Sequence, residues 1–562
     1  MGKVKGGKLV VDALKKEGVT HIFSISGGHI APIYDVLLDS DIELVIARHE
    51  QAAAMMAGGW ARSTGQVGVA LVTAGPGFTN ALTGIADACM AAAPVVCIAG
   101  AVSVDMADRL DLQDLNQLDV VKPITNWART IRTTGRIGEA IHEAFKQARN
   151  GPTGPVFMEI PADVLGDEID EEDVVPSKPI ERPRPGLAPK EIDKIVEMIK
   201  AAKKPVLIAG SGVHYGDGSK HLVDFAEKSG IPTYTTGLGK GCIPDDHPMC
   251  YGPSLVIRPG SAMNALTQGD LLIMIGSRIS LFFAYGKILN PAAQFIHLNI
   301  DHREIGRNRT PDLGLVADAG RALEQLAAVA DGNLDPKAFE PWRAELDTAH
   351  TNALAFFGQQ LGDAEMPMHP LRLCKELDEF LGEDDILITD GGDTQVWMNM
   401  LRKNSKPGHT LESGLFGCLG VGIPFGMAAA MAYPEKRVFV ITGDGSVGFN
   451  FMELQTSLCK NINLTVVINN DKAWGMVKHS QMLNYGPDRC CGVEIGDVPY
   501  HKMVEALGGN GVEVDKIEDI KPALEDAVKR GGVNMINVNV RPNVISPGSI
   551  ALAQIGKKGG GY

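Results

Sequence analysis

Residues 438–471 read VFVITGDGSVGFNFMELQTSLCKNINLTVVINND, and this stretch decides the fold class. It begins with an apolar, β-branched run and turns at Gly443-Asp444-Gly445. An amphipathic run follows, and a second apolar run occupies residues 464–468. A strand, a glycine turn, a helix and a second strand form the repeating unit of a parallel α/β sheet. The stretch therefore predicts one such unit.

The turn in this unit has the residue types that a metal-bound diphosphate requires. Glycines let the backbone approach a phosphate, and the next helix offers free N–H groups and the positive end of its dipole. Asp444 can ligate a divalent cation, and Asn469-Asn470-Asp471 ends the next strand. Parallel strands end at the same edge of a sheet, so these polar side chains can reach the same cation.

A dinucleotide fingerprint is the competing interpretation of the turn. Residues 443–448 also satisfy G-x-G-x-x-G, and Asp471 lies near the place of a ribose-binding acid. A metal-bridged diphosphate explains the Asp inside the turn and the Asn469-Asn470 pair, whereas a nicotinamide cofactor explains neither. The motif alone is weak, and the rest of the chain has to decide.

Composition limits the class of protein. The 562 residues predict roughly three to four domains, and the net charge of -15 argues against binding to nucleic acid. Nine cysteines without metal-ligand spacing fit a reduced compartment, so we expect a cytoplasmic location. The N-terminus has no apolar signal core, and the longest uncharged apolar run contains Pro94. We therefore expect no association with a membrane.

Two breaks divide the chain into three segments. A Pro-rich stretch at residues 176–185 reads as a linker, and a second break covers residues 362–370. Short apolar runs alternate with helical patterns between them, which is typical of a doubly wound sheet. The predicted fold is α/β, with three doubly wound parallel-sheet domains and a tail. The expected boundaries are 1–175, 190–345 and 366–540 for the domains and 541–562 for the tail.

Segments one and three share a weak internal repeat. Residues 69–77 and residues 438–445 both lead from an apolar strand into a glycine turn, and the two glycines of each turn coincide. In this alignment Pro76 falls on Asp444, so the first copy lacks the metal ligand. Two related domains with divided roles suggest a cofactor bound between them.

Together these motifs resemble the thiamine diphosphate enzymes of the decarboxylase and acetohydroxyacid synthase superfamily. The similarity runs over essentially the whole chain and is closest to benzaldehyde lyase and the 2-hydroxyacyl-CoA lyases. The matching stretches are residues 26–30, 48–50, 70–75, 77–80, 112–113, 123–128, 443–448 and 474–475. The resemblance implies pyrimidine-binding, central Rossmann-like and diphosphate-binding domains, in that order. It also implies thiamine diphosphate, Mg²⁺ and a homo-oligomer, a dimer at least and a tetramer by expectation, with active sites at the dimer interface.

The resemblance assigns three catalytic residues. Glu50 would hydrogen-bond the aminopyrimidine ring of the cofactor and relay its proton; the alternative is a carboxylate that only satisfies a helix dipole. His29 and Gln113 would orient the oxygens of the substrate and relay protons. Their alternatives are a surface or core histidine and a solvated loop residue. The Arg48-His49 pair before Glu50 favours the catalytic role.

The same resemblance predicts the cofactor site. The cation would be held by Asp444, Asp471 and the backbone carbonyl of Ala473, with Asn470 as the alternative ligand after a one-residue shift. Leu419 would bend the cofactor into a V shape, although plain core packing would also explain it, and Gly417 would offer its carbonyl. The predicted cofactor-binding residues are Glu50, Thr73, Gly391, Gly392, Asp393, Gly417, Leu419, Asp444, Gly445, Ser446, Asp471, Ala473, Trp474 and Gly475.

The expected chemistry is the cleavage or formation of a C–C bond next to a carbonyl. Cleavage of 2-hydroxyacyl-CoA to formyl-CoA and an aldehyde or ketone is the first expectation, with Gly28, Met476 and Glu494 near the substrate. Lys557 and Lys558 of the tail would lie near CoA phosphates if the tail closed as a lid; a frayed terminus is the alternative.

Other functions remain open at this point. A benzaldehyde lyase-type aldehyde lyase and an acetohydroxyacid (acetolactate) synthase are the alternatives within the family, and an adenine nucleotide (ADP) could occupy the central domain. A nicotinamide dehydrogenase or a non-catalytic relative would belong to another class. Glu50 argues against both, because neither has a use for a carboxylate at that place.

Overall fold

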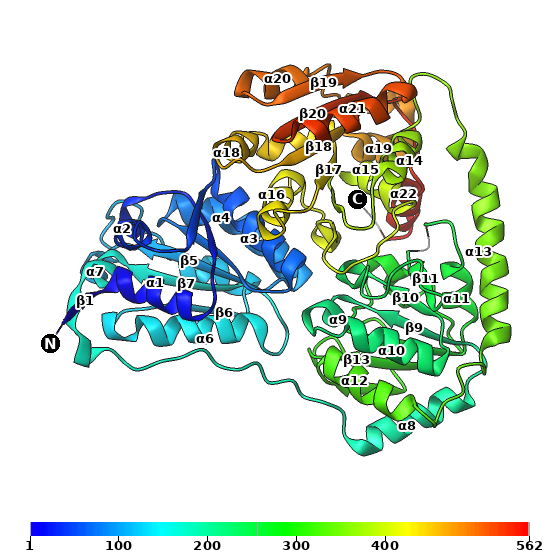
Figure 1. Cartoon of the computed structure of the whole chain (residues 1–562), viewed down its shortest axis with the longest axis horizontal. Helices are drawn as coiled ribbons and strands as arrows, with labels where there is room; N and C mark the ends of the chain where they lie inside the picture. Colours follow the sequence, from blue (N-terminus) through cyan, green and yellow to red (C-terminus); the bar gives the residue numbers. More distant parts are fainter. Residues whose placement is uncertain (1, 256, 560–562) are drawn as a thin grey trace. The chain divides into compact units, whose positions relative to one another are not determined.

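The computed structural model describes residues 2–255 and 257–559. Within these residues the strands form three six-stranded sheets and one two-stranded pair. All strand pairs within the three large sheets are parallel. The predicted α/β fold with three doubly wound parallel sheets is confirmed (Figure 1).

The first sheet lies in the N-terminal third of the chain. Its strands are β2 (His21–Ser24), β3 (Glu43–Ile46), β4 (Gly68–Val72), β5 (Val95–Ala101), β6 (Trp127–Thr130) and β7 (Val156–Pro161). Its helices are α1 (Gly6–Lys16), α2 (Ala31–Leu37), α3 (Glu50–Thr64), α4 (Pro76–Ala91), α5 (Gln117–Val121), α6 (Ile137–Arg149) and α7 (Ala162–Gly166). The strand order is β3-β2-β4-β5-β7-β6, and a separate antiparallel pair joins β1 (Lys3–Lys5) to β8 (Glu168–Asp170).

Helices cover both faces of this sheet, because alternate side chains of a strand point to opposite faces. Val69 and Leu71 of β4 pack with α1 and α6 in one buried cluster. On the other face, the ring of Phe78 in α4 lies 5.0 Å from the ring of Phe157 in β7. Figure 1 shows α1 and α6 on one side of the sheet and α3 and α4 on the other. Burial on both faces explains why these strands are continuously apolar.

The second sheet forms the middle of the chain. Its strands are β9 (Pro205–Ala209), β10 (Thr233–Thr235), β11 (Cys250–Pro253), β12 (Leu271–Ile275), β13 (Gln294–Asn299) and β14 (Leu313–Val316). Its helices are α8 (Pro189–Ala201), α9 (Ser211–Tyr215), α10 (Ser219–Ser229), α11 (Ala262–Gln268), α12 (Ala319–Ala330) and α13 (Glu340–Leu361). The order β11-β10-β9-β12-β13-β14 is that of a sheet made of two mononucleotide-binding halves.

The third sheet contains both strands of the stretch 438–471. Its strands are β15 (Ile386–Thr389), β16 (Thr410–Leu411), β17 (Val438–Gly443), β18 (Leu464–Asn470), β19 (Asn510–Val514) and β20 (Val533–Asn539). The helices in this part of the chain are α14 (Pro370–Phe380), α15 (Gly392–Asn399), α16 (Gly422–Ala432), α17 (Asp444–Val447), α18 (Glu453–Cys459), α19 (Gly475–Tyr485), α20 (Tyr500–Leu507), α21 (Ile517–Arg530) and α22 (Pro547–Gly559).

The first and third sheets have the same topology. The order β16-β15-β17-β18-β20-β19 repeats β3-β2-β4-β5-β7-β6 strand for strand when each sheet is counted from its own first strand. In this comparison β4 corresponds to β17, and β5 corresponds to β18. These are the strands that flank the two aligned glycine turns, so the topology supports the internal repeat seen in the sequence.

Two helical segments differ from the expected pattern. The amphipathic run after β17 is broken into α17, a single turn at Gly448–Asn450, and α18. Gly448 is a poor helix former, and the buried Asn450 amide donates to the carbonyl of Gly420 at 2.7 Å instead of facing solvent. The sequence pattern did not predict the 22-residue α13, which carries several charges.

No helix in the described part of the chain is long and apolar enough to span a bilayer.

The chain divides into two compact units. The first contains residues 1–183, 413–434 and 450–462, and therefore includes α16 and α18. The second contains residues 184–412, 435–449 and 463–562, and therefore includes the second and third sheets. The three domain boundaries drawn from the sequence stay a prediction.

A buried ion pair holds α3 against α4 inside the first unit. Arg62 donates to a carboxylate oxygen of Asp87 at 2.5 Å, and both side chains are 1% exposed. The Arg62 guanidinium also lies 4.6 Å from the ring centre of Phe425 in α16. Removing one partner of a buried pair leaves an uncompensated charge, which is more damaging than the loss of the contact itself.

We predict that Asp87→Asn lowers the free energy of unfolding by about 3–5 kcal/mol, because Arg62 keeps its buried charge without a counter-ion. The urea midpoint, followed by circular dichroism, measures this loss. The control is Glu197→Gln, which removes a solvent-exposed ion pair to Lys194 and should leave the midpoint unchanged. Equal midpoints for Asp87→Asn and the wild type would contradict the prediction.

Candidate functional site

Glu50 is the first residue of α3 and lies at the carboxyl edge of the first sheet. The residue is 9% exposed, and its Oε2 accepts a hydrogen bond from the Asn80 amide of α4 at 2.9 Å. His49 caps the helix, since its Nδ1 accepts from the N–H of Gln51 at 3.1 Å. The helix is therefore capped by another side chain, and capping does not account for the Glu50 carboxylate.

The segment before Glu50 is held by a second buried carboxylate. Glu453, at the start of α18 in the same unit, accepts from the N–H groups of Arg48 and His49 at 2.8 and 3.1 Å. Burial raises the pKa of Glu453, and the two N–H donors oppose that shift. The two backbone N–H groups that precede α3 are thus both hydrogen-bonded. These hydrogen bonds hold the backbone at the start of the helix, where Glu50 lies.

The structure brings His29 and Gln113 together on Thr73. The Thr73 hydroxyl lies 3.4 Å from His29 Nδ1 and donates to Gln113 Oε1 at 3.5 Å. A Cβ at Gly77 would lie 2.8 Å from Thr73 Cγ2 and 3.5 Å from Glu50 Oε1, which places this polar group beside Glu50. The site of the first unit is therefore a partly buried cluster of a carboxylate, an imidazole, a hydroxyl and an amide.

The Gln113 loop is anchored by a buried chain of hydrogen bonds. The N–H of Gly75 donates to Gln117 Oε1 at 3.1 Å, and Gln117 Nε2 donates to Glu159 Oε2 at 2.8 Å. Thr130 donates to the other oxygen of Glu159 at 2.6 Å. A Cβ at Gly75 would lie 2.9 Å from Gln113 Cβ, so the glycine is needed where the loop passes over it. Gln113 itself has a φ of +68°, a strained value for a non-glycine residue.

Other predicted residues of the first unit lie in open positions. A Cβ at Gly28 would meet no atom within 4 Å, so there is space for another group beside His29. Gly417 has a φ of +64° and follows a short turn, Gly414–Phe416, that contacts α4. Gly417 is exposed and Leu419 is only partly buried. Leu419 is therefore available to a ligand as well as to core packing.

The second unit brings Asp444 and Asp471 together. Asp444 begins α17 directly after β17, and Asp471 follows β18, its neighbour in the sheet. Burial and the negative charge of Asp471 raise the pKa of Asp444 to about 8. Burial also raises the pKa of Asp471. Asp444 Oδ2 is buried with no hydrogen-bond partner among the described residues. Two facing carboxylates of this kind fit a cation, which would supply the missing positive charge.

Ala473 and Asn470 differ in what they can offer to a cation. The Asn470 side chain is used by the protein, because its amide donates to Asn537 at 3.0 Å and its oxygen accepts from the Lys472 N–H at 3.1 Å. This geometry favours Asp471 over Asn470 as the ligand. In the described chain no group of three or more His, Cys, Asp or Glu side chains could hold a metal, so the predicted set depends on the Ala473 carbonyl.

Glycines bring the turns of the second unit close together. A Cβ at Gly391 would lie 3.0 Å from Ser446 Oγ, and one at Gly392 would lie 2.7 Å from Met476 Sδ. At Gly445 a Cβ would lie 2.6 Å from the Trp474 ring. In the turns after β15, β17 and β18, the backbone of one turn therefore packs directly against a side chain of another. A phosphate cradle needs a backbone that can be approached this closely.

Of the substrate expectations, Glu494 lies at the surface of the second unit. Glu494 is exposed and forms an ion pair with Lys478 at 2.7 Å. The tail forms α22, but the side chains of Lys557 and Lys558 lie outside the described part of the structure. The suggestion that these lysines contact CoA phosphates therefore stays untested.

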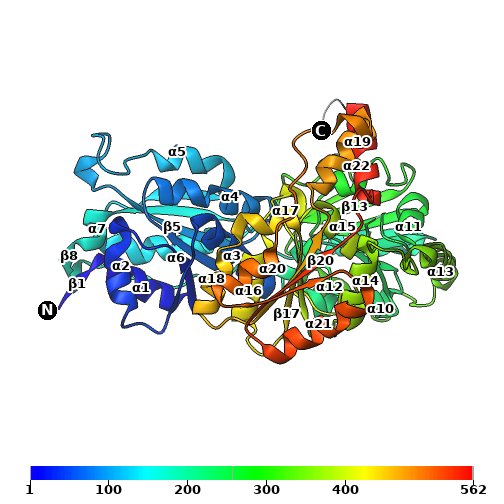
Figure 2. The ribbon, with the colours of Figure 1, turned by 90° about the horizontal axis from the view of Figure 1, so that it is seen from above.

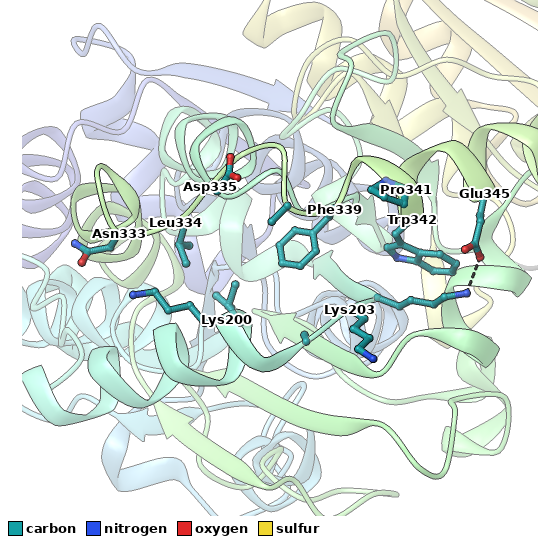
Figure 3. Close-up of a pocket in the computed structure, with 13 residues that line it drawn as sticks. Lys200, Lys203, Asn333, Leu334, Asp335, Phe339, Pro341, Trp342 and Glu345 are labelled. Carbon is teal, nitrogen blue, oxygen red and sulfur yellow. Dashed lines mark hydrogen bonds and ion pairs between the residues drawn. The ribbon is translucent and has the colours of Figure 1, made fainter.

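A cavity of about 590 Å³ lies in the second unit beside β9 (Figure 3). Lys200 and Lys203 lie along one side of it, facing Phe339 and Trp342 on the other. Lys204, which precedes β9, pairs with Glu345 at 2.5 Å. This places the cavity at the amino end of β9, whereas nucleotides bind at the carboxyl ends of such strands. None of the predicted site residues lines it.

Several residues that hold the site were not predicted from the sequence. Asn80, Gln117 and Glu159 support the first unit, and His479 and Ser549 support the second through Asp393. Asn80 lies in a matched motif and could have been found there. Gln117 and His479 lie four residues beyond matched stretches, and Glu159 and Ser549 lie far from any, so no motif includes these four residues.

Comparisons with known proteins agree with this geometry. The chain matches three family models described as thiamine pyrophosphate enzyme: the N-terminal TPP binding domain over residues 4–120, the central domain over 192–326 and the C-terminal TPP binding domain over 390–538.

Proteins similar over nearly the whole chain carry two kinds of name. A protein described as a probable acetolactate synthase large subunit from Methanocaldococcus jannaschii is 34% identical, covering 96% of this chain and 92% of its own. The acetolactate synthase large subunit of Mycobacterium tuberculosis is 31% identical over 96% of both chains. A 2-hydroxyacyl-CoA lyase 2 from Danio rerio is 29% identical, covering 97% of this chain and 93% of its own.

The raised pKa of Asp444 predicts a pH-dependent stability. The pKa of Asp444 is near 4 in the unfolded chain and about 8 in the folded protein. Between pH 4 and pH 8 the folded protein therefore keeps a proton on this carboxyl that the unfolded chain has lost. Stability from this group is therefore lost as the pH rises through that window, and Asp444→Asn should avoid the loss. Without divalent cations, we expect the melting temperature of Asp444→Asn to rise relative to wild type from pH 5 to pH 8. A constant difference across this range would contradict the prediction.

Proposed function

The chain belongs to the thiamine pyrophosphate-dependent enzymes, and from this premise we propose that it forms or cleaves a C–C bond next to a carbonyl. The observation that carries the proposal is Glu50, a nearly buried carboxylate at the start of α3 that accepts a hydrogen bond from a neutral amide, that of Asn80. Helix capping does not explain it, because His49 caps the helix. The two facing carboxylates of the second unit support the same reading.

Glu50 would bind the aminopyrimidine ring and hold the proton that is exchanged there. When bound, the cofactor supplies the nucleophilic carbon and the electron sink of the reaction. Asn80 donates to one carboxylate oxygen of Glu50 and leaves the other oxygen for the ring. Glu453 accepts hydrogen bonds from the N–H groups of Arg48 and His49 and so holds the backbone just before Glu50 in place. Proton transfer needs such a fixed geometry more than it needs a particular pKa.

His29, Thr73 and Gln113 would handle the substrate oxygens. The Thr73 hydroxyl lies within hydrogen-bonding reach of both other side chains, so it fixes their orientation relative to each other. A histidine can accept or donate a proton near neutral pH, which suits the hydroxyl next to the bond that is broken. The open space at Gly28 would admit the substrate beside His29.

A divalent cation, which we propose is Mg²⁺, would be held by Asp444, Asp471 and the Ala473 carbonyl. Oxygen ligands suit Mg²⁺, and the cation would relieve the repulsion between the two carboxylates. The cradle of Gly391, Gly445 and their neighbours would accept the diphosphate. The adenine nucleotide considered for the central domain has no support from the comparisons, and we leave it out of the proposal.

Acetolactate synthesis is the first candidate for the reaction. The comparisons favour it, since several proteins with this name are 31–34% identical over more than 90% of this chain. Such an enzyme would join two 2-oxo acids after decarboxylating the first. This candidate replaces the CoA lyase reaction as the leading one, because the comparisons support the lyase through a more distant relative.

Cleavage of 2-hydroxyacyl-CoA is the second candidate. The cluster of His29, Thr73 and Gln113 favours it, because a lyase must remove a proton from the hydroxyl beside the bond that breaks. The similarity to the Danio rerio lyase supports it as well. A benzaldehyde lyase-type reaction would use the same side chains with a smaller substrate.

We also propose a homo-oligomer, at least a dimer and by family resemblance a tetramer. The resemblance that identified Glu50 and Asp444 implies a cofactor held by the first domain of one copy and the third domain of another. Mass measurement of the purified protein in solution tests this part directly.

One assay separates the candidate reactions. The protein is supplied with thiamine diphosphate and Mg²⁺, and then with pyruvate, with a short 2-hydroxyacyl-CoA or with benzoin in parallel. Acetolactate from pyruvate would support the first candidate, and formyl-CoA with an aldehyde would support the second. Benzaldehyde from benzoin alone would favour the smaller substrate, and no product from any of them would contradict the proposed function.

We predict that Glu50→Gln lowers kcat at least about 100-fold, because the variant keeps the shape of the side chain but cannot exchange the proton. Cofactor binding should persist, and titration of the intrinsic tryptophan fluorescence with thiamine diphosphate measures it. The matched control is Glu304→Gln, since Glu304 is also a 9% exposed residue but pairs with Arg307 in the central domain. Activity retained by Glu50→Gln would refute the assignment.

A further inference from the structure

Asp393 is a buried carboxylate whose two oxygens are both used by the protein. Ser546 and Ser549 donate to Oδ1, the second at 2.8 Å, and His479 Nδ1 lies 2.6 Å from Oδ2. The residue lies in the first turn of α15, directly after Gly391 and Gly392. A buried carboxylate is tolerated when charge-assisted hydrogen bonds satisfy it, and here three side chains do so.

These donors come from two other segments of the chain. His479 lies in α19, the helix that follows Asp471, and the serines lie at the start of α22. Figures 1 and 2 show α22 beside α19, and α22 also contacts α15. Asp393 therefore joins the turn after β15, the helix after β18 and the C-terminal helix.

The start of α22 is oriented by this contact. Ser546 accepts from the Ser549 N–H at 3.1 Å, as a helix N-cap does, and its own hydroxyl hydrogen points to Asp393. Ser546 and Ser549 are 0% and 1% exposed. Undocking α22 would leave the Asp393 carboxylate with one donor in place of three, which is costly for a buried charge.

The same network reaches the residues proposed to hold the cation. A Cβ at Gly475 would lie 2.5 Å from Asp471 Oδ2 and 3.5 Å from Asp393 Oδ2. His479 is one turn beyond Gly475, and helical side chains point back toward the N-terminus. On the other side, a Cβ at Gly391 would lie 3.0 Å from Ser446 Oγ. A shift of Asp393 would therefore displace the turns on both sides of the proposed diphosphate cradle.

We propose that Ser546, Ser549 and His479 are positioning residues of the diphosphate site, and that docking of α22 is coupled to cofactor binding through Asp393. The inference rests on the proposed function for the identity of the ligand. It assigns Asp393 to the support of the cradle and not to direct contact with the cation, since both its oxygens are already occupied. Coupling between sites is reciprocal, so the bound cofactor must stabilise α22 as much as docked α22 tightens the binding of the cofactor.

The first test uses the unmodified protein. Hydrogen exchange of the backbone amides in residues 547–554 is measured without ligand, with Mg²⁺ alone, and with Mg²⁺ plus thiamine diphosphate. We expect the full ligand set to slow exchange in α22, although the helix lies outside the predicted cradle. Binding of thiamine diphosphate with unchanged exchange in α22 would overturn the coupling. Absence of any binding would instead count against the proposed function.

The second test removes the donors. We expect the double variant Ser546→Ala, Ser549→Ala to weaken the Kd for thiamine diphosphate about tenfold, within the usual range of coupling between sites. Ser546→Thr, Ser549→Thr should restore binding because it keeps both hydroxyls. The control is Ser254→Ala, which removes a buried hydroxyl of the central domain that donates to Thr235. An unchanged Kd in a folded double alanine variant would refute the positioning role.

His479→Asn provides an independent arm, since it acts on the other oxygen of Asp393. We expect a weaker Kd for thiamine diphosphate together with faster exchange in α22 when the ligand is bound. A purely structural role would lower the melting temperature of the unliganded protein and leave the Kd unchanged. That result would also refute the proposal.

Discussion

The candidate site of the second unit depends on one constraint: the turns at the carboxyl ends of its parallel strands must pack closely against one another. Three turns meet there, and glycine is required wherever one turn passes over the side chain of another. The same edge carries Asp444 and Asp471, which repel each other when both are charged. Packing thus holds together two carboxylates whose repulsion is relieved when Asp444 is protonated, and would also be relieved by a bound cation. The hydrogen bonds around Asp393 supply part of the stability that this arrangement requires.

The first and third sheets share one topology but carry different chemistry. The turn after β17 carries Asp444, and the corresponding turn after β4 carries Pro76, which cannot ligate a metal. The first unit uses its turn differently, since Gly75 and Gly77 make room for Gln113, Thr73 and Glu50. The shared topology therefore gives both folds a turn at the same place, and we propose that one turn serves a proton-exchanging carboxylate and the other an anion cradle.

Much of the site could be predicted because its residues lie in short local motifs. Strand periodicity placed β15, β17 and β18 closely, and the glycine turns located Asp444 and Gly391. The break in the helix after β17 was missed, because the contact of Asn450 with Gly420 is not local. The sequence motifs ranked the lyase above the synthase, whereas the comparisons favour the synthase. Local motifs do not separate the two, since both reactions use the same cofactor chemistry and differ in a few substrate contacts.

The sequence alone determined the α/β class, the three parallel sheets and the family, because periodicity and glycine motifs are local properties of the chain. Only the tertiary structure decided which side chains support the site. Glu453 accepts from the N–H groups of Arg48 and His49, which lie 405 and 404 residues away in the sequence. Ser549 donates to Asp393, which lies 156 residues away. The physical reason is that a buried carboxylate takes its donors from whatever segment packs beside it, and packing partners leave no periodic signal in the sequence.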